Sequence, residues 1–500
     1  MSRYAILAAG TIGGAALLGG LPAAAQLTAP QVWEDWQDTY GLLGGTLTAE
    51  AEDYADGTLR LSGVAIASEM AGGRSDTTIG DITLTEPGDG TVVVTFPDVM
   101  AVVTTTEVDG ETIVTEAQVT QNDLRVVASE EAGARRYLTT ATSMIANFEL
   151  PDLEDEGALG ALQIATRGYD STYVGTGAAF EQDATMESLT FQAFGEVDPA
   201  DPQAEAGEVP DGATVRFQMT DVTSEFAGTY PEAPMTAGAT IAELGLEMAG
   251  VLRHGGSLIE VDVDGPDAFT AQGGSESGAL EIALTESSIT QALSSEGTAM
   301  EVMAPAFGAP VPFELGSTRI EMQVPLGASE EALPFGLVLA LRDMTVGEAV
   351  WGALDPTGQL PREPASLVVD IDGTAAMSAD IFGDPAAMAE LSGPPGDLET
   401  LTIAELLLSF GGATLTGQGE LTFPGAGPEP EPVGTIDLAL EGGMALLDRL
   451  VALGVLPQDQ ALGVRAMLGV VARPVGEDSL VSTIEFTEGG GISANGMQVQ

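Results

Sequence analysis

The chain alternates apolar and polar residues over many short segments, and this pattern limits the fold more than any other feature. Thr58–Val64 has apolar side chains at alternate positions, and the same style continues in Gly90–Phe96, Glu111–Val119 and Asp123–Ser129. Turns such as Asp56-Gly57 separate these segments. Alternation bounded by such turns is typical of half-buried strands joined by hairpins. We therefore predict an α+β fold that is mainly antiparallel β, with long curved meander sheets and packing helices.

Helical periodicity interrupts the strands at a few places. A helix is predicted over Ala29–Leu43, because Thr28 is a suitable N-cap, Pro30 lies in the first turn and Gly44 follows. Further helices are predicted near residues 239–253 and 398–410. Residues 443–472 read as two helices joined near Leu456, which would form a C-terminal helical hairpin.

The best domain boundary is the acidic, Pro-rich segment 196–214, which has few large apolar residues and is predicted to be a loop or linker. It would separate an N-terminal helix and β-meander, residues 26–195, from a second β-rich half, residues 215–500. A long hairpin loop within one continuous sheet is the alternative. A Gly-Gly pair followed by a strand after three of the predicted helices suggests a repeated unit, although short matches also arise by chance in a glycine-rich chain.

The first 25 residues have the features of a secretory signal peptide. Arg3 precedes an apolar stretch from Tyr4 to about Leu21, and Ala23 and Ala25 are the small residues that signal peptidase requires. We predict cleavage between Ala25 and Gln26. An uncleaved membrane anchor is the alternative, which the short length and five glycines of the stretch disfavour. No later segment is apolar over about 18 residues, so no integral membrane segment is expected after cleavage.

The charge is strongly one-sided, with 76 acidic and 15 basic residues and a net charge of −61. Such a charge repels nucleic acid and anionic membrane surfaces, so we expect no nucleic-acid partner. Acidic surfaces stay hydrated and suit a salty environment, where salt screens their repulsion; a basic partner is the alternative explanation. The absence of cysteine excludes disulfides and thiolate chemistry.

Candidate chemical sites are few. His254 is the only histidine and lies at a predicted helix end, where a structural role is favoured over a catalytic triad. Glu260, Asp262 and Asp264 have the first spacings of a calcium loop, but Ala271 occupies the twelfth position. A strand with one wet face explains the same residues, and a weak calcium site is the alternative. We predict no catalytic residue, no cofactor and no metal beyond this candidate.

The two ends of the chain resemble a known family. Ala445–Pro474 runs into Ile484-Glu485-Phe486, the chain closes with Gly490–Gly496, and a helix containing Val32-Trp33 opens the mature protein. These residues resemble an uncharacterised family of alphaproteobacterial exported proteins, a domain of unknown function (DUF2125-like). The resemblance implies a Gram-negative periplasm and brings no catalytic residues.

These observations favour a soluble, non-catalytic periplasmic protein exported by a Sec-type signal peptide. A curved sheet with one aliphatic face could hold a lipid or another apolar ligand. The first alternative is a carboxylate-dependent hydrolase of envelope glycans. The second is a structural or interaction module, whose protein partners the sequence does not identify.

Overall fold

The computed structural model describes residues 27–499 with these exceptions: 71–72, 109–110, 150–158, 197–211, 232–233, 236–244, 266–267, 306–307, 380–394 and 426–430. The predicted signal peptide and its cleavage site at Ala25 and Gln26 lie outside the described residues. The chain packs as two compact units, which divide near residue 270. Unit 1 runs up to Thr270 and unit 2 from Ala271 onward.

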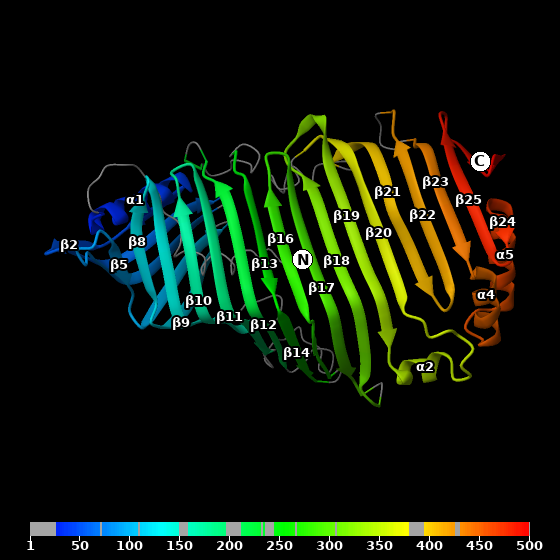
Figure 1. The fold of residues 1–500 in the computed structure, drawn as a ribbon, viewed down its shortest axis with the longest axis horizontal. Coiled ribbons are helices and arrows are strands. Elements are labelled where there is room, and N and C mark those ends of the chain that lie inside the picture. The colour runs from blue at the N-terminus through cyan, green and yellow to red at the C-terminus, as the bar shows by residue number, and fades with distance from the viewer. Residues whose placement is uncertain are drawn as a thin grey trace. The chain divides into compact units, whose positions relative to one another are not determined.

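Within the described residues, unit 1 contains the helix α1 and a series of antiparallel strands (Figure 1). The elements in chain order are α1 (Ala29–Leu42), β1 (Gly45–Thr48), β2 (Ala51–Ala55), β3 (Thr58–Met70), β4 (Gly73–Thr85), β5 (Val92–Thr95), β6 (Val99–Val108), β7 (Glu111–Asn122), β8 (Arg125–Glu131), β9 (Ala134–Glu149), β10 (Leu159–Gly175), β11 (Ala179–Glu196), β12 (Gly212–Thr229), β13 (Met248–His254) and β14 (Gly256–Asp264). Most neighbours in sequence pair directly, as a meander requires. Several strands pair with two shorter partners along one edge: β3 with β1 and β2, β4 with β5 and β6, β9 with β8 and β7, and β12 with β13 and β14.

The core of unit 1 lies where α1 packs on the sheet. Val32, Trp33 and Trp36 are buried on one side of α1, as the sequence predicts. They join buried aliphatic residues of β3, β4, β5 and β8 and the aromatic residues Tyr137 and Tyr173. A second cluster of buried apolar side chains lies farther along β7, β9, β10, β11 and β12.

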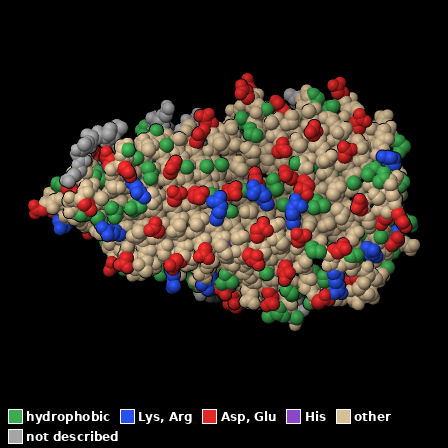
Figure 2. Space-filling view, in the orientation of Figure 1, with side chains coloured by type: hydrophobic (Ala, Val, Ile, Leu, Met, Phe, Trp, Pro, Cys, Tyr) green, Lys and Arg blue, Asp and Glu red, His purple; other side chains and the backbone are tan. Residues whose placement is uncertain are grey.

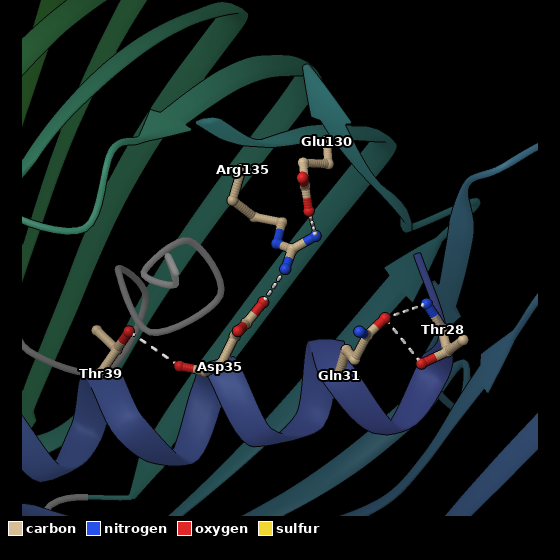
Figure 3. Close-up of polar contacts among 6 residues, drawn as sticks. All are labelled: Thr28, Gln31, Asp35, Thr39, Glu130 and Arg135. Carbon is tan, nitrogen blue, oxygen red and sulfur yellow. Dashed lines mark hydrogen bonds and ion pairs between the residues drawn. The ribbon is translucent and has the colours of Figure 1, made fainter. Parts of the chain in front are cut away.

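Polar contacts fix the position of α1 (Figure 3). The side-chain oxygen of Gln31 accepts hydrogen bonds from the N–H and the hydroxyl of Thr28, both at 3.0 Å, which caps the first turn. Arg135 on β9 lies 2.6 Å from Asp35 on α1 and 3.2 Å from Glu130 on β8. Burial raises the pKa of Asp35, and Arg135 opposes this rise. The ion pair therefore joins helix to sheet in a largely buried place.

Unit 2 is also built from antiparallel strands. After β15 (Phe269–Gly274), at the boundary between the units, its strands are β16 (Ser277–Leu284), β17 (Ser288–Met303), β18 (Val311–Pro325), β19 (Ser329–Val346), β20 (Ala365–Met377), β21 (Gly396–Phe410), β22 (Ala413–Thr422), β23 (Val433–Glu441), β24 (Arg473–Gly476), β25 (Ser479–Thr487), β26 (Gly491–Ala494) and β27 (Met497–Gln498). Its helices are α2 (Glu348–Leu354), α4 (Gly443–Ala452) and α5 (Gln458–Val471). The prediction of a mainly antiparallel β fold with a C-terminal helical hairpin is confirmed.

Both units contain left-handed residues in the middle of long strands, which we call the crease. In unit 1 they include Gly63, Gly168 and Asp221, with φ of 59°, 62° and 50°; in unit 2 they include Gly297 and Asp343, with φ of 60° and 58°. Glycine and aspartate are among the residues that tolerate this conformation. Such a residue bends its strand and shifts the alternation of side chains by one position.

Two predicted helices are wrong. Residues 398–410 form part of strand β21, and the described part of 239–253 includes strand β13. In consequence His254 lies at a strand end. Gly411 and Gly412 lie in the turn between β21 and β22, so the proposed repeat of helix, Gly-Gly and strand does not hold there.

The predicted linker at 196–214 lies mostly outside the described residues. The strands on either side of it, β11 and β12, pair with each other from Glu196 opposite Gly212 onward. The two strand ends that border residues 197–211 therefore lie next to each other within unit 1.

Candidate ligand-binding face

The strands of unit 2 carry a row of mainly apolar side chains on one face, which ends at the polar residue Ser482. Directly opposed residues of antiparallel strands point to the same side of the sheet. The pairings connect the following residues from β16 to β25 in turn: Leu280, Leu293, Ile320, Leu339, Val369, Leu406, Gly417, Leu438 and Ser482. Eight steps of one strand spacing make this row about 38 Å long.

A second row runs beside the first, two residues along each strand. Its members are Ile282, Gln291, Met322, Leu337, Ile371, Ile403, Gly419, Ile436 and Ile484. Gln291 is its one polar side chain. We call the surface formed by these two rows the apolar face.

Two local features keep the apolar face continuous. Ile371 pairs with Ile403 and Val369 with Leu406, so β21 has an irregularity around Glu405 that restores the alternation. Gly417 has no side chain, but an added Cβ there would lie only 2.7 Å from Leu438 and 3.1 Å from Leu406. The two leucines therefore close over this glycine from both sides.

The apolar face is open to water over several strands. The exposed fractions of Leu280, Leu293, Met322, Ile320 and Leu337 are 51, 49, 47, 41 and 40%. Leucine and isoleucine side chains that adjoin one another across strands normally pack under a second layer. Contiguous apolar surface of this extent marks a site for a ligand, a membrane or a partner.

The crease extends the same surface beyond the two rows. The hydroxyls of Ser295 and Thr298 lie 3.0 Å apart, on either side of the left-handed Gly297. Side chains three positions apart therefore share one side of β17, which alternation alone would forbid. Met300 and Val302 accordingly follow Thr298 on the side of Leu293.

The opposite side of the same strands carries charged side chains beside buried apolar residues such as Ala340 and Val368. Arg342 pairs with Glu405 at 2.8 Å, and Arg319 pairs with Glu321. Burial and then the nearby carboxylates raise the pKa of Asp370. On the face in view in Figure 2, acidic and arginine side chains lie beside one another with scattered hydrophobic ones. Unit 2 is thus an amphipathic sheet.

The helices of unit 2 pack at the ends of strands. Trp351 of α2 stacks on Phe410 at the end of β21, with ring centroids 6.5 Å apart. Asp478 accepts hydrogen bonds from the first N–H groups of α4, at Met444 and Ala445. In Figure 1 these helices lie at the margin of the strands of unit 2. They leave the leucines of β16 to β19 half exposed.

The structure places the calcium candidates on strand β14 in unit 1. Glu260, Asp262 and Asp264 are exposed and alternate with less exposed valines, which is the predicted strand with one wet face. Arg216 lies 3.2 Å from Glu260. Within the described ranges, no group of three or more acidic or histidine side chains has an arrangement that could hold a metal ion.

His254 lies at the end of β13, apart from the apolar face. Burial lowers its pKa, and its Nδ1 is buried without a hydrogen-bond partner. The sequence analysis predicted a structural role for His254 at the end of a helix, but the structure has strand β13 there.

A cavity of about 530 Å³ lies in unit 1. Its lining includes Thr46 and Thr48 of β1, Ile66 of β3 and the ion pair of Arg74 with Asp76 on β4. The mixed polar and apolar lining contains no arrangement of catalytic groups, so the apolar face remains the stronger candidate.

Sequence reasoning predicted an aliphatic sheet face but did not locate it. The available signal was a run of strands whose alternate residues are Leu, Ile, Val or Met, from Leu280 to Ile484. A chain-wide comparison of cross-strand partners would have been needed to align them.

The resemblance to the DUF2125 family is confirmed for the C-terminal half of the chain. Residues 256–491 match a family described as an uncharacterized protein conserved in bacteria (DUF2125). The matched region contains every strand that contributes to the apolar face. No curated protein and no solved structure shows a significant match to the chain. Among the described residues, no helix is long and apolar enough to cross a membrane.

Proposed function

We propose that this protein is exported to the periplasm and there binds the acyl chains of a lipid on the apolar face, without catalysing a reaction. The observation that carries the proposal is the apolar face across β16 to β25, five of whose apolar side chains on β16 to β19 are 40–51% exposed. A ligand that covers these side chains removes their apolar surface from water, which is favourable in proportion to the area buried.

The dimensions suit an acyl chain. A bilayer core of about 30 Å contains two layers of chains, so one chain spans about 15 Å. The apolar face, about 38 Å long, exceeds this length. A chain that lies across the strands would contact an aliphatic side chain on each strand that it crosses except β22, which contributes Gly417 and Gly419.

The carboxylate-dependent hydrolase has less support. Asp370 and Glu405 lie opposite each other on the charge-bearing side of neighbouring strands, and Arg342 pairs with Glu405. An acid and a base for glycoside hydrolysis must instead face each other across a bound sugar. The open apolar face also favours ligand binding over a purely structural module.

The test starts from delipidated protein that is incubated with lipids extracted from a Gram-negative envelope and then separated by gel filtration. We expect lipid to elute with the protein and to be identified by mass spectrometry. Elution of the protein without bound lipid would refute the proposal that the apolar face binds a lipid. Export is tested separately by N-terminal sequencing of the protein purified from the periplasmic fraction, and this protein should begin at Gln26.

A further inference from the structure

Helix α5 exposes an apolar surface of its own. Leu462, Met467 and Val470 have exposed fractions of 57, 59 and 55%. With 100° per residue, these three and Ala466 fall within an arc of about 140°. Val455, before the helix, and Val475, after it, are also more than half exposed. We call these five large side chains (Leu462, Met467, Val470, Val455 and Val475) the α5 patch.

The other side of α5 is fixed to its own unit. Ala461 is buried, and Arg465 forms an ion pair with Asp448 of α4. At its C-terminal end, the carbonyl of Val471 accepts hydrogen bonds from the hydroxyl of Ser482 at 2.5 Å and from the side chain of Asn495 at 2.9 Å. The helix therefore presents Leu462, Met467 and Val470 outward in a defined orientation.

Ser482 connects the α5 patch to the apolar face. It is the last residue of the first apolar row, opposite Leu438 on β23. The end of α5 thus contacts the β25 end of that row. A surface that covers the α5 patch would lie next to one end of the proposed acyl-chain site.

The size of the α5 patch argues against a second protein as its occupant. Full burial of such a side chain removes about 60–120 Å² from water, so five half-exposed side chains offer about 250 Å². A stable protein interface buries about 800 Å² on each partner. In a bilayer interface, by contrast, each inserted side chain contributes separately.

The charge indicates which bilayer is favoured. The net charge of −61 repels an anionic surface. Near α5, Asp448 is engaged by Arg465 and Asp478 by the N-terminus of α4. The exposed Asp459 in the first turn of α5, however, lies within the same arc as Leu462 and Val470. A zwitterionic surface accepts the α5 patch without this repulsion.

We infer that the α5 patch docks the protein on a zwitterionic lipid surface and brings the β25 end of the apolar face to that surface. This inference rests on the proposed function, because it names the surface with which the acyl-chain site exchanges lipid. Docking uses α5, whereas holding a lipid uses the strands, so separate substitutions can address the two.

The experiment measures co-flotation of the mature protein with phosphatidylcholine vesicles. The test variant is Leu462→Gln with Met467→Gln and Val470→Gln, since glutamine keeps helix propensity. The control variant carries Val99→Gln and Val114→Gln, which replace exposed apolar residues of unit 1. Circular dichroism and Tm confirm that each variant is folded.

The parent and the control variant should float with the vesicles, and the α5 variant should bind at least about tenfold more weakly. All three should retain the same amount of a phosphatidylcholine supplied from ethanol, because the apolar face is unchanged. Equal flotation of the α5 variant and the parent would overturn the inference, as would a dimer that the substitutions dissociate. Flotation that depends on α5 in a protein that retains no lipid would refute the acyl-chain site and leave the docking surface standing.

Discussion

Polar substitution within the apolar face should weaken ligand binding by a predictable amount. We consider Leu293→Asn, Ile320→Asn and Leu337→Asn, at positions that are 49, 41 and 40% exposed. Full burial of such a side chain contributes about 1.5–3 kcal/mol. Because about half of each side chain is already covered in the free protein, a ligand can gain only about 1 kcal/mol from each.

Each single variant should therefore bind about fivefold more weakly, and the triple variant about 100-fold more weakly, since 1.4 kcal/mol corresponds to a factor of ten. The assay is isothermal titration calorimetry with a short-chain phosphatidylcholine below its micelle concentration. The free protein also loses the half of each side chain that was buried, so its Tm should fall as well.

A control variant separates binding from stability. Phe194→Asn and Val215→Asn replace residues of unit 1 with exposed fractions of 38 and 39%. They should lower Tm by a similar amount per substitution and leave the lipid affinity unchanged. If the triple variant bound like the parent, or if the control weakened binding equally, the apolar face would not be the binding surface.

Three further predictions concern stability. Arg135→Met leaves the carboxylate of Asp35 buried without its partner and should lower the free energy of unfolding by about 3–5 kcal/mol. Adding Asp35→Asn should recover part of this loss. A urea titration that finds no loss for Arg135→Met would contradict a stabilising role of the ion pair. The pKa of Asp370 is raised in the folded protein, so stability falls as pH rises from the pKa of the unfolded chain to that of the folded protein. Asp370→Asn should therefore raise Tm at neutral pH, and this gain should disappear in acid, where Asp370 is protonated in both the folded and the unfolded protein. Gly297→Ala should lower the free energy of unfolding by about 1–2 kcal/mol, because Gly297 has a left-handed backbone. The loss should exceed that of Gly133→Ala, because the new Cβ at 297 would lie 2.7 Å from Glu276, whereas at Gly133 no atom lies within 4 Å. Equal losses in urea titrations would show that Glu276 moves aside freely.

Local signals were sufficient for α1 and for the C-terminal hairpin. Thr28 and Pro30 mark the start of α1, and its buried residues Val32 and Trp36 recur at helical spacing. In the hairpin, Pro457 separates two apolar runs, and the structure ends α4 at Ala452 and begins α5 at Gln458. Each of these helices depends on residues within a few turns of one another, which a single sequence displays.

The failed helix prediction at 398–410 has a specific cause. Ala404, Glu405 and Leu406 favour a helix by intrinsic propensity. The irregularity near Glu405 also places Ile403 and Leu406 on the same side of β21, three positions apart. That spacing imitates a helical period, and only the cross-strand partners Val369 and Ile371 show that the segment is extended.

The left-handed residues of the crease also interrupt the alternation of apolar and polar residues in the sequence. On β17 the residues on the side of the apolar face are Leu293 and Ser295 before Gly297, and Thr298 and Met300 after it. The alternation therefore changes phase at this left-handed glycine. A glycine or aspartate at such a phase change is therefore a usable signal for a bent strand. Alternation also shows that one side of each strand is apolar, but it cannot show whether another layer covers that side. Coverage depends on where the helices pack, and in unit 2 they pack at the strand ends, which leaves the apolar face available to a ligand.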